Sequence, residues 1–161
     1  MTTAAAIAEV EEQMNILAGL IRRSIRDAAV SVDPALQPFG LKVLGLLSRC
    51  GPTHASSVAE TLVVDRSVVS RQAAQLQELG LIQVQADPSD GRARFLAVTP
   101  LAEQKLAEMR AGNKALVRRR LGTWPEEDLR QLAALIARLN TPDDPAAEAN
   151  ADPDADADAP A

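Results

Sequence analysis

The sequence is poor in aromatic side chains. Its 161 residues include no tyrosine, two phenylalanines and one tryptophan. Proteins that bind RNA or single-stranded DNA stack bases on several exposed rings, so this composition disfavours that class of function. The chain is long enough to enclose a hydrophobic core, and that core must be aliphatic.

Cysteine and histidine each occur once, as Cys50 and His54. A single cysteine permits no internal disulfide, and no second thiol is present to resolve an oxidised Cys50, which we interpret as structural or incidental. One histidine and one cysteine cannot supply three or four nitrogen and sulfur ligands, so we expect no metal and no cofactor. No apolar run reaches the length of a signal or membrane segment, and we therefore expect a cytoplasmic protein without a membrane partner.

Bases are absent from the C-terminal end of the chain. The net charge is −5, but seven acids and no basic residue follow residue 142, in a tract of almost only Ala, Asp and Pro. Such a composition predicts a disordered acidic tail over residues 141–161. Without those seven acids, 17 basic residues stand against 15 acidic ones. The overall acidity therefore does not argue against binding to DNA.

The stretch Asp65–Gly80 predicts an amphipathic helix with an unusually polar outer side. At about 100° per residue, its apolar side chains point one way and its polar ones the other. Asp65 is suited to cap the first turn through its carboxylate, and Gly80 to end the helix. The inward side chains are Val69, Ala73 and Leu76, and the outward ones are Ser67, Ser70, Arg71, Ala74 and Glu78.

A shorter helix is predicted immediately before it, over Thr53–Val64. Only Val63 and Val64 separate its apolar run from Asp65, so the two helices form a helix-turn-helix. After Gly80 the pattern becomes extended, and the turn residues of DPSDGRAR separate two short apolar runs, which predicts a β-hairpin. A helix-turn-helix followed by a hairpin is a winged helix.

The segment Pro52–Pro100 resembles the DNA-binding core of the MarR family of bacterial transcriptional regulators. The matching residues are Val69 to Arg71, Leu76, Leu79 to Ile82, Asp87-Pro88, Asp90, Arg92 and Val98 to Pro100. Two positions depart from the family pattern. Val63 stands where glycine is usual, so we expect a turn without a positive φ there. At the wing tip, Gly91-Arg92 replaces a frequent pair of arginines.

The resemblance implies a mainly α fold with a small β-hairpin wing, in which N- and C-terminal dimerisation helices flank the winged helix-turn-helix. We expect residues 1–30 to form the first dimerisation helix, 36–100 the DNA-binding core and 100–140 two further helices. Apolar stripes at helical spacing over Ile7–Ala28 and Leu129–Leu139 support a homodimer, since each stripe needs a partner. Thr99 is suited to cap the next helix and Pro100 to occupy its first position. Near the inner side of that helix we place Leu101, Lys105, Leu106, Met109, Leu116 and Val117.

The expected partner is double-stranded DNA, with the Asp65–Gly80 helix in the major groove and the wing in the minor groove. Thr53–Thr99 carries four arginines against five acids, so affinity must come from placement and from two copies. The candidate DNA-binding residues are Ser56, Arg66, Ser67, Ser70, Arg71, Gln75, Asp90, Arg92 and Arg94. By resemblance, a small aromatic or phenolic effector would release the DNA from a repressor, and Phe39 is the candidate lining residue of its site.

Other functions are weighed on the same residues. Asp87 and Asp90 could suggest a pair of catalytic carboxylates, but their place in a turn beside arginines favours a structural role. The serines have no placed histidine base and no nucleophile elbow, so we expect no enzyme. The rival hypothesis is a winged helix that binds proteins instead of DNA. Arg71 and Arg92 both lie at expected groove-facing positions, which favours the DNA-binding hypothesis. We interpret the arginines at 22, 23, 26 and 118–120 as parts of solvated or subunit-pairing surfaces and not as DNA contacts.

Overall fold

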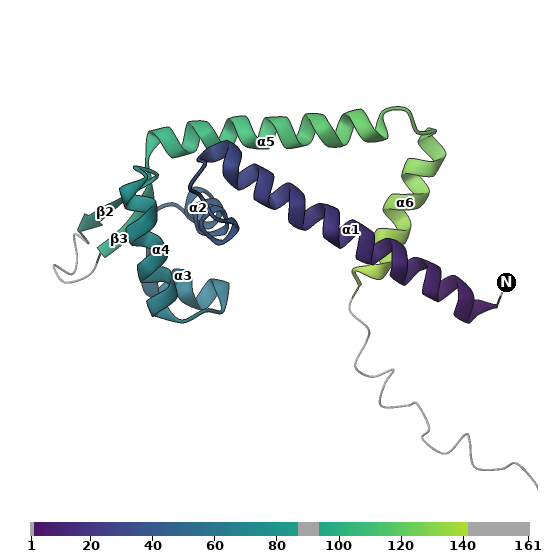
Figure 1. Cartoon of the computed structure of the whole chain (residues 1–161), viewed down its shortest axis with the longest axis horizontal. Helices are drawn as coiled ribbons and strands as arrows, with labels where there is room; N and C mark the ends of the chain where they lie inside the picture. The colour runs from purple at the N-terminus through teal and green to yellow at the C-terminus, as the bar shows by residue number, and fades with distance from the viewer. Residues whose placement is uncertain (1, 87–93, 142–161) are drawn as a thin grey trace, which may run out of the picture. The chain divides into compact units, whose positions relative to one another are not determined.

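The computed structural model describes residues 2–86 and 94–141 and divides the chain into two compact units, Met1–Leu116 and Val117–Ala161. Figure 1 shows the order of the elements along the chain. They are α1 (Thr3–Val32), α2 (Pro38–Cys50), β1 (Thr53–His54), α3 (Ala55–Leu62), α4 (Arg66–Glu78), β2 (Ile82–Ala86), β3 (Arg94–Val98), α5 (Pro100–Leu121) and α6 (Glu126–Leu139). The expected fold class, mainly α with a small hairpin, is confirmed. The wing residues 87–93, Asp90 and Arg92 among them, and the tail beyond Thr141 lie outside the described residues.

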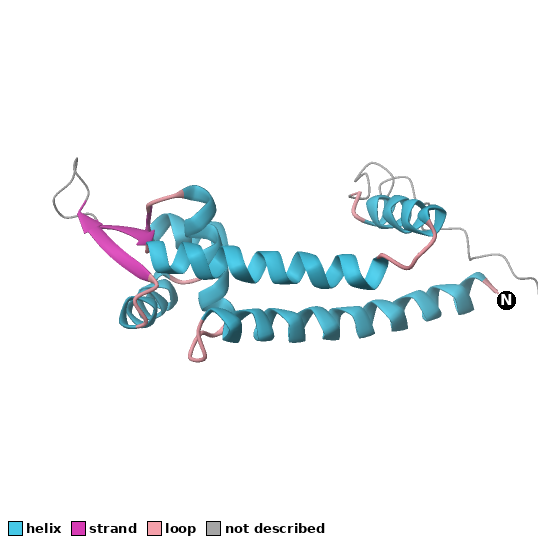
Figure 2. Cartoon of the chain, turned by 90° about the horizontal axis from the view of Figure 1, so that it is seen from above, coloured by secondary structure: helices cyan, strands magenta, loops and turns pink. Residues whose placement is uncertain are grey.

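The strands form one antiparallel sheet in the order β1-β3-β2, seen in magenta in Figure 2. β2 and β3 pair as the expected hairpin, with Ile82 opposite Val98. The prediction of a helix over Thr53–Val64 is wrong at Thr53 and His54. They form the short strand β1, in which Thr53 pairs with Leu96. These two residues form a strand only because β3 lies beside them and pairs with them. The local sequence pattern does not show this pairing.

The core of the first unit is aliphatic, as the composition predicts. α2, α3, α4, β2, β3 and α5 all contribute to it, and Val43, Leu44, Leu47, Val58, Val69, Leu76, Leu81 and Leu106 are completely buried. The three inward residues expected of α4 are all buried there. One side of α4 is therefore fixed against the core, which leaves the other side outward.

The C-terminal end of α4 is fixed by Gly80, as expected. Gly80 has φ +67°, its N–H donates to the carbonyl oxygen of Gln77, and the N–H of Leu81 donates to that of Leu76 at 2.9 Å. These two bonds form a Schellman motif, which needs a residue in the left-handed region. At the other end, Asp65 holds the N-cap position without the expected side-chain hydrogen bond.

The joint between α3 and α4 contradicts the expectation for Val63. Val63 has φ +55° and ψ +53°, in the left-handed region, and is 89% exposed. The N–H of Val63 donates to the carbonyl oxygen of Glu60, and the N–H of Val64 donates to that of Ala59. The last carbonyl groups of α3 are therefore hydrogen-bonded in the geometry that glycine usually provides. The chain therefore keeps the tight turn of the motif and accepts backbone strain at a β-branched residue.

The terminal helices carry apolar side chains that the chain itself leaves uncovered. In α1 the stripe residues Ile7, Val10, Met14, Leu17, Ile21 and Ile25 are all exposed, and α6 has no buried residue. In α5, Leu106 is buried and Lys105 and Met109 are half-buried, as expected of its inner side. Leu101, Leu116 and Val117 are exposed, so their expected inner positions are wrong for the single chain. None of the helices in the described ranges combines the length and apolar character that crossing a bilayer requires.

Candidate nucleic-acid interface

The outer side of α4 presents a small polar group that includes one positive charge. Ser67, Ser70 and Arg71 are exposed, on the opposite side from buried Val69 and Leu76. Their spacing of three and four residues puts them on one face over about one turn. Hydroxyls and a guanidinium on one helical face are suited to phosphate oxygens and to base edges in the major groove.

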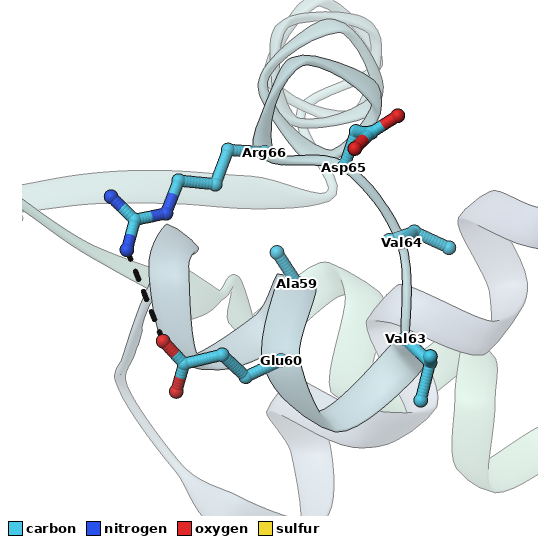
Figure 3. Close-up of a pocket in the computed structure, with 6 residues that line it drawn as sticks. All are labelled: Ala59, Glu60, Val63, Val64, Asp65 and Arg66. Carbon is cyan, nitrogen blue, oxygen red and sulfur yellow. Dashed lines mark ion pairs between the residues drawn. The ribbon is translucent and has the colours of Figure 1, made fainter.

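Arg66 begins α4 and lies beside the helix-turn-helix joint. Its guanidinium is 3.9 Å from the carboxylate of Glu60 on α3, and both side chains are largely exposed. Figure 3 shows these two side chains turned toward each other, with Asp65 pointing elsewhere. An exposed ion pair of this length contributes little, so Arg66 can exchange Glu60 for a phosphate at small cost.

Gln75 does not join the outward group. Its side chain is half-buried, with its Nε2 donating to the carbonyl oxygen of Ala35 at 3.3 Å and its Oε1 accepting from Gln72 Nε2 at 3.0 Å. The amide that we expected to face DNA is thus used within the protein. Gln72, a residue that the sequence reading did not single out, is the buried partner.

The base of the wing brings Arg94 and His54 together. The His54 ring stacks on Phe95 with centroids 4.0 Å apart, and its Nδ1 lies 3.3 Å from the carbonyl oxygen of Arg94. The Arg94 residue itself is exposed at the start of β3. Ser56, in the first turn of α3, is half-buried. Its expected contact with a phosphate stays a prediction.

Thr99 ties the end of the wing to both neighbouring helices. Its hydroxyl donates to the carbonyl oxygen of Gly80 at 2.8 Å and accepts from the N–H of Ala102 at 3.2 Å, as the expected cap of α5. Its own N–H donates to Leu81. The ends of α4 and β3 and the start of α5 therefore meet at one hydrogen-bonded joint.

A second candidate site is a cavity of about 720 Å³ bordered by α1, α2, α3 and α5, which we call the α2 cavity. Phe39, the candidate residue of the effector site, lines it among apolar side chains that include Ile25, Leu106 and Met109. Three cations that the sequence reading missed, Lys42, Arg49 and Arg110, also line it. The spacing Phe39, Lys42, Arg49, which places all three on one face of α2, was the signal that could have revealed two of them.

The arrangement offers no metal centre within residues 2–86 and 94–141, where no three His, Cys, Asp or Glu side chains are grouped to hold an ion. Cys50 is exposed and outside any disulfide.

The two-helix motif, the paired strands after it and the polar outer side of α4 define a winged helix-turn-helix protein. Residues 41–93 match the model of the MarR family. The chain is also 30% identical, over 125 residues, to the uncharacterized HTH-type transcriptional regulator YxaD of Bacillus subtilis, a match that covers 77% of this chain and 87% of that protein. The chain belongs to the MarR family of DNA-binding transcriptional regulators, which are not enzymes.

Two further comparisons agree with this assignment. The HTH-type transcriptional repressor MdtR of B. subtilis is 33% identical over 102 residues, which are 63% of this chain and 66% of MdtR. The crystal structure of YusO from B. subtilis superposes with a TM-score of 0.75 at 26% identity, over 86% of this chain and 97% of YusO.

Proposed function

We propose that the protein binds a pseudo-palindromic operator in double-stranded DNA as a homodimer, in the cytoplasm, and represses transcription until a small aromatic or phenolic effector releases it. The observation that carries this proposal is the outward face of α4. Ser67, Ser70 and Arg71 are exposed on a helix whose opposite side is locked into the core, so they can enter a major groove without any rearrangement.

The proposed homodimer rests on the uncovered apolar stripes of α1 and α6. A second copy of the chain is the partner that can cover both, because a two-fold dimer presents each stripe to its counterpart. Two copies also double the number of arginines at the DNA, which compensates for the nearly balanced charge of the core. In this proposal residues 1–30 and 100–140 dimerise and residues 36–100 read the operator, with the wing arginines Arg92 and Arg94 at the minor groove and Asp90 holding an arginine in place.

The proposed effector site is the α2 cavity. An aromatic ring would lie against Phe39 and the aliphatic wall, and a carboxylate or phenolate would face Lys42, Arg49 or Arg110. The repressor name of MdtR supports the proposed direction of regulation.

A salt-titrated mobility-shift assay on the promoter region next to the protein's own gene tests the proposal. Arg71→Ala removes one contact from each half-site, at about 1–3 kcal/mol per bidentate base contact, so specific binding should be lost while the fold and dimer persist. Arg130→Ala is the matched control, because Arg130 pairs with Glu126 on α6 and should not touch DNA. Unchanged operator affinity in Arg71→Ala would remove α4 as the reading helix and would favour the protein-binding alternative.

A further inference from the structure

A short chain of hydrogen bonds joins α4 to the loop between α1 and α2. Gln72 is only 9% exposed, and its Nε2 donates to Gln75 Oε1, while Gln75 Nε2 donates to the carbonyl oxygen of Ala35. A buried amide is costly unless it is bonded, so Gln72 depends on its partner to remain in the core. The two glutamines therefore act as one unit, fixed at its far end to residue 35.

The first turn of α2 presses on the same unit from another direction. A Cβ atom built on Gly40 would lie 2.9 Å from Gln72 Nε2 and 2.7 Å from Leu36 Cδ1. Gly40 is buried, and the ends of the Leu36 and Gln72 side chains occupy the space beside it. A movement of this turn would therefore displace the Gln72 amide.

The other side of the same turn forms a wall of the α2 cavity. Pro38, Phe39, Leu41 and Lys42 all line that cavity, and Gly40 lies between them in the sequence. One turn of α2 thus has the cavity on one side and the glutamine pair of α4 on the other. A packed interior transmits displacement instead of absorbing it. A displacement of the cavity wall therefore reaches α4 at Gln72 and Gln75.

We propose that Gln72 and Gln75 are positioning residues that set the orientation of α4 according to the state of the α2 cavity. This inference rests on the proposed function, in which α4 reads DNA and the cavity holds the effector. The glutamines touch neither ligand. They hold α4 against residues 35–40, so that a displacement of Phe39 becomes a displacement of Ser67, Ser70 and Arg71 relative to the groove.

The first experiment observes the linkage without DNA or effector. Phe39→Leu is introduced into the full chain, and the side-chain NH₂ resonances of the glutamines are followed by ¹⁵N NMR. The Gln72 and Gln75 pairs should shift, and the Gln104 pair should not, because Gln104 bonds to Glu108 on the exposed side of α5. Phe39→Met serves as a second variant if Phe39→Leu does not fold. Unmoved Gln72 and Gln75 resonances would overturn the inference.

The second experiment is a double-mutant cycle on operator affinity. Phe39→Leu should change the affinity of the wild-type background by between about 2-fold and 30-fold, since coupling along such networks runs to about 0.5–2 kcal/mol. In the Gln75→Met background, which keeps the length of the side chain but loses both hydrogen bonds, the same substitution should have less than half that effect in free energy. Gln77→Met, an exposed glutamine of α4, is the matched control and should leave the response intact.

The outcomes separate the two proposals. An equal effect of Phe39→Leu in both backgrounds, or no effect in either, would overturn the role of the glutamines. A wild-type protein that binds no operator would instead refute the proposed function, while the NMR experiment would still decide whether the cavity and α4 are linked.

Discussion

Lys105 donates a hydrogen bond to the carbonyl oxygen of Val32, with Nζ 2.8 Å from the oxygen, although the two residues are 73 positions apart in the chain. Val32 is the last residue of α1, so the ammonium lies at the negative end of the helix dipole. The carboxylate of Asp33 lies 3.9 Å from the same Nζ. α5 therefore secures the end of α1 just before the loop that leads to Ala35 and Gly40.

Replacing this lysine should destabilise the first unit. Lys105→Met keeps most of the aliphatic stem but leaves the Val32 carbonyl without its donor, and we expect a loss on the order of 1 kcal/mol, since the site is partly exposed. Urea unfolding at fixed protein concentration measures it. Lys114→Met, on the exposed part of α5, is the control, and an equal loss in both variants would show that the contact to Val32 is not responsible.

Replacing the strained residue Val63, in contrast, should raise the free energy of unfolding. Val63→Gly removes left-handed strain of about 1–2 kcal/mol. The greater conformational freedom of glycine in the unfolded chain offsets part of this gain, so we expect a net increase in stability on the order of 1 kcal/mol. The same substitution at Val64, which packs against the core and has no positive φ, should reduce the free energy of unfolding. Chemical denaturation of both variants provides the test. A Val63→Gly protein that is less stable than the wild type would contradict the left-handed conformation.

The homodimer can be tested by placing charge in its proposed seams. Leu17 and Leu132 are 54% and 36% exposed in the single chain, and Leu17→Asp with Leu132→Asp should give a monomeric or unfolded protein without operator binding. Burying two such stripes is worth several kcal/mol at about 25 cal/mol per Å². Asn15→Asp with Gln131→Asp adds the same charge to the same helices outside the stripes, and this control should remain dimeric. Sedimentation at micromolar concentration distinguishes the states, and a monomeric wild type that binds its operator would refute the dimer.

The seven acids after residue 142 should act on DNA binding through charge alone. Ending the chain at Asn140 should leave the dimer intact and give equal or tighter operator affinity, because negative charge near the DNA is removed. A full-length variant with those acids changed to Asn and Gln should behave like the truncated protein in a shift assay at low salt. Weaker binding in either variant would show that the tail contributes to the complex.

Much of the local architecture follows from the sequence because it depends on neighbours along the chain. The period of 3.6 residues in Val69, Ala73 and Leu76 places one side of α4 in the core, and the inward set was correct at all three positions. Gly80 predicted the end of α4, because the left-handed residue of a Schellman motif has few substitutes. Thr99 predicted the start of α5 for a similar reason.

Tertiary structure decided the features that depend on residues distant in sequence. Thr53 and His54 became a strand because β3, more than 40 positions later, offered hydrogen-bond partners. Gln75 turned inward because the Ala35 carbonyl and the Gln72 amide were within reach, although its helical position alone allowed an outward side chain.

The turn at Val63 shows the limit most clearly. Local propensity disfavours a positive φ at valine, but the packing of α3 against α4 fixes the path between them, and the energy of that packing exceeds the strain at one exposed residue. The sequence by itself thus determined where the main helices lie and which side of α4 is apolar. Only the folded structure decided which polar side chains remain free to meet DNA and which are used to hold the protein together, because that choice depends on what each amide and guanidinium finds within hydrogen-bonding distance.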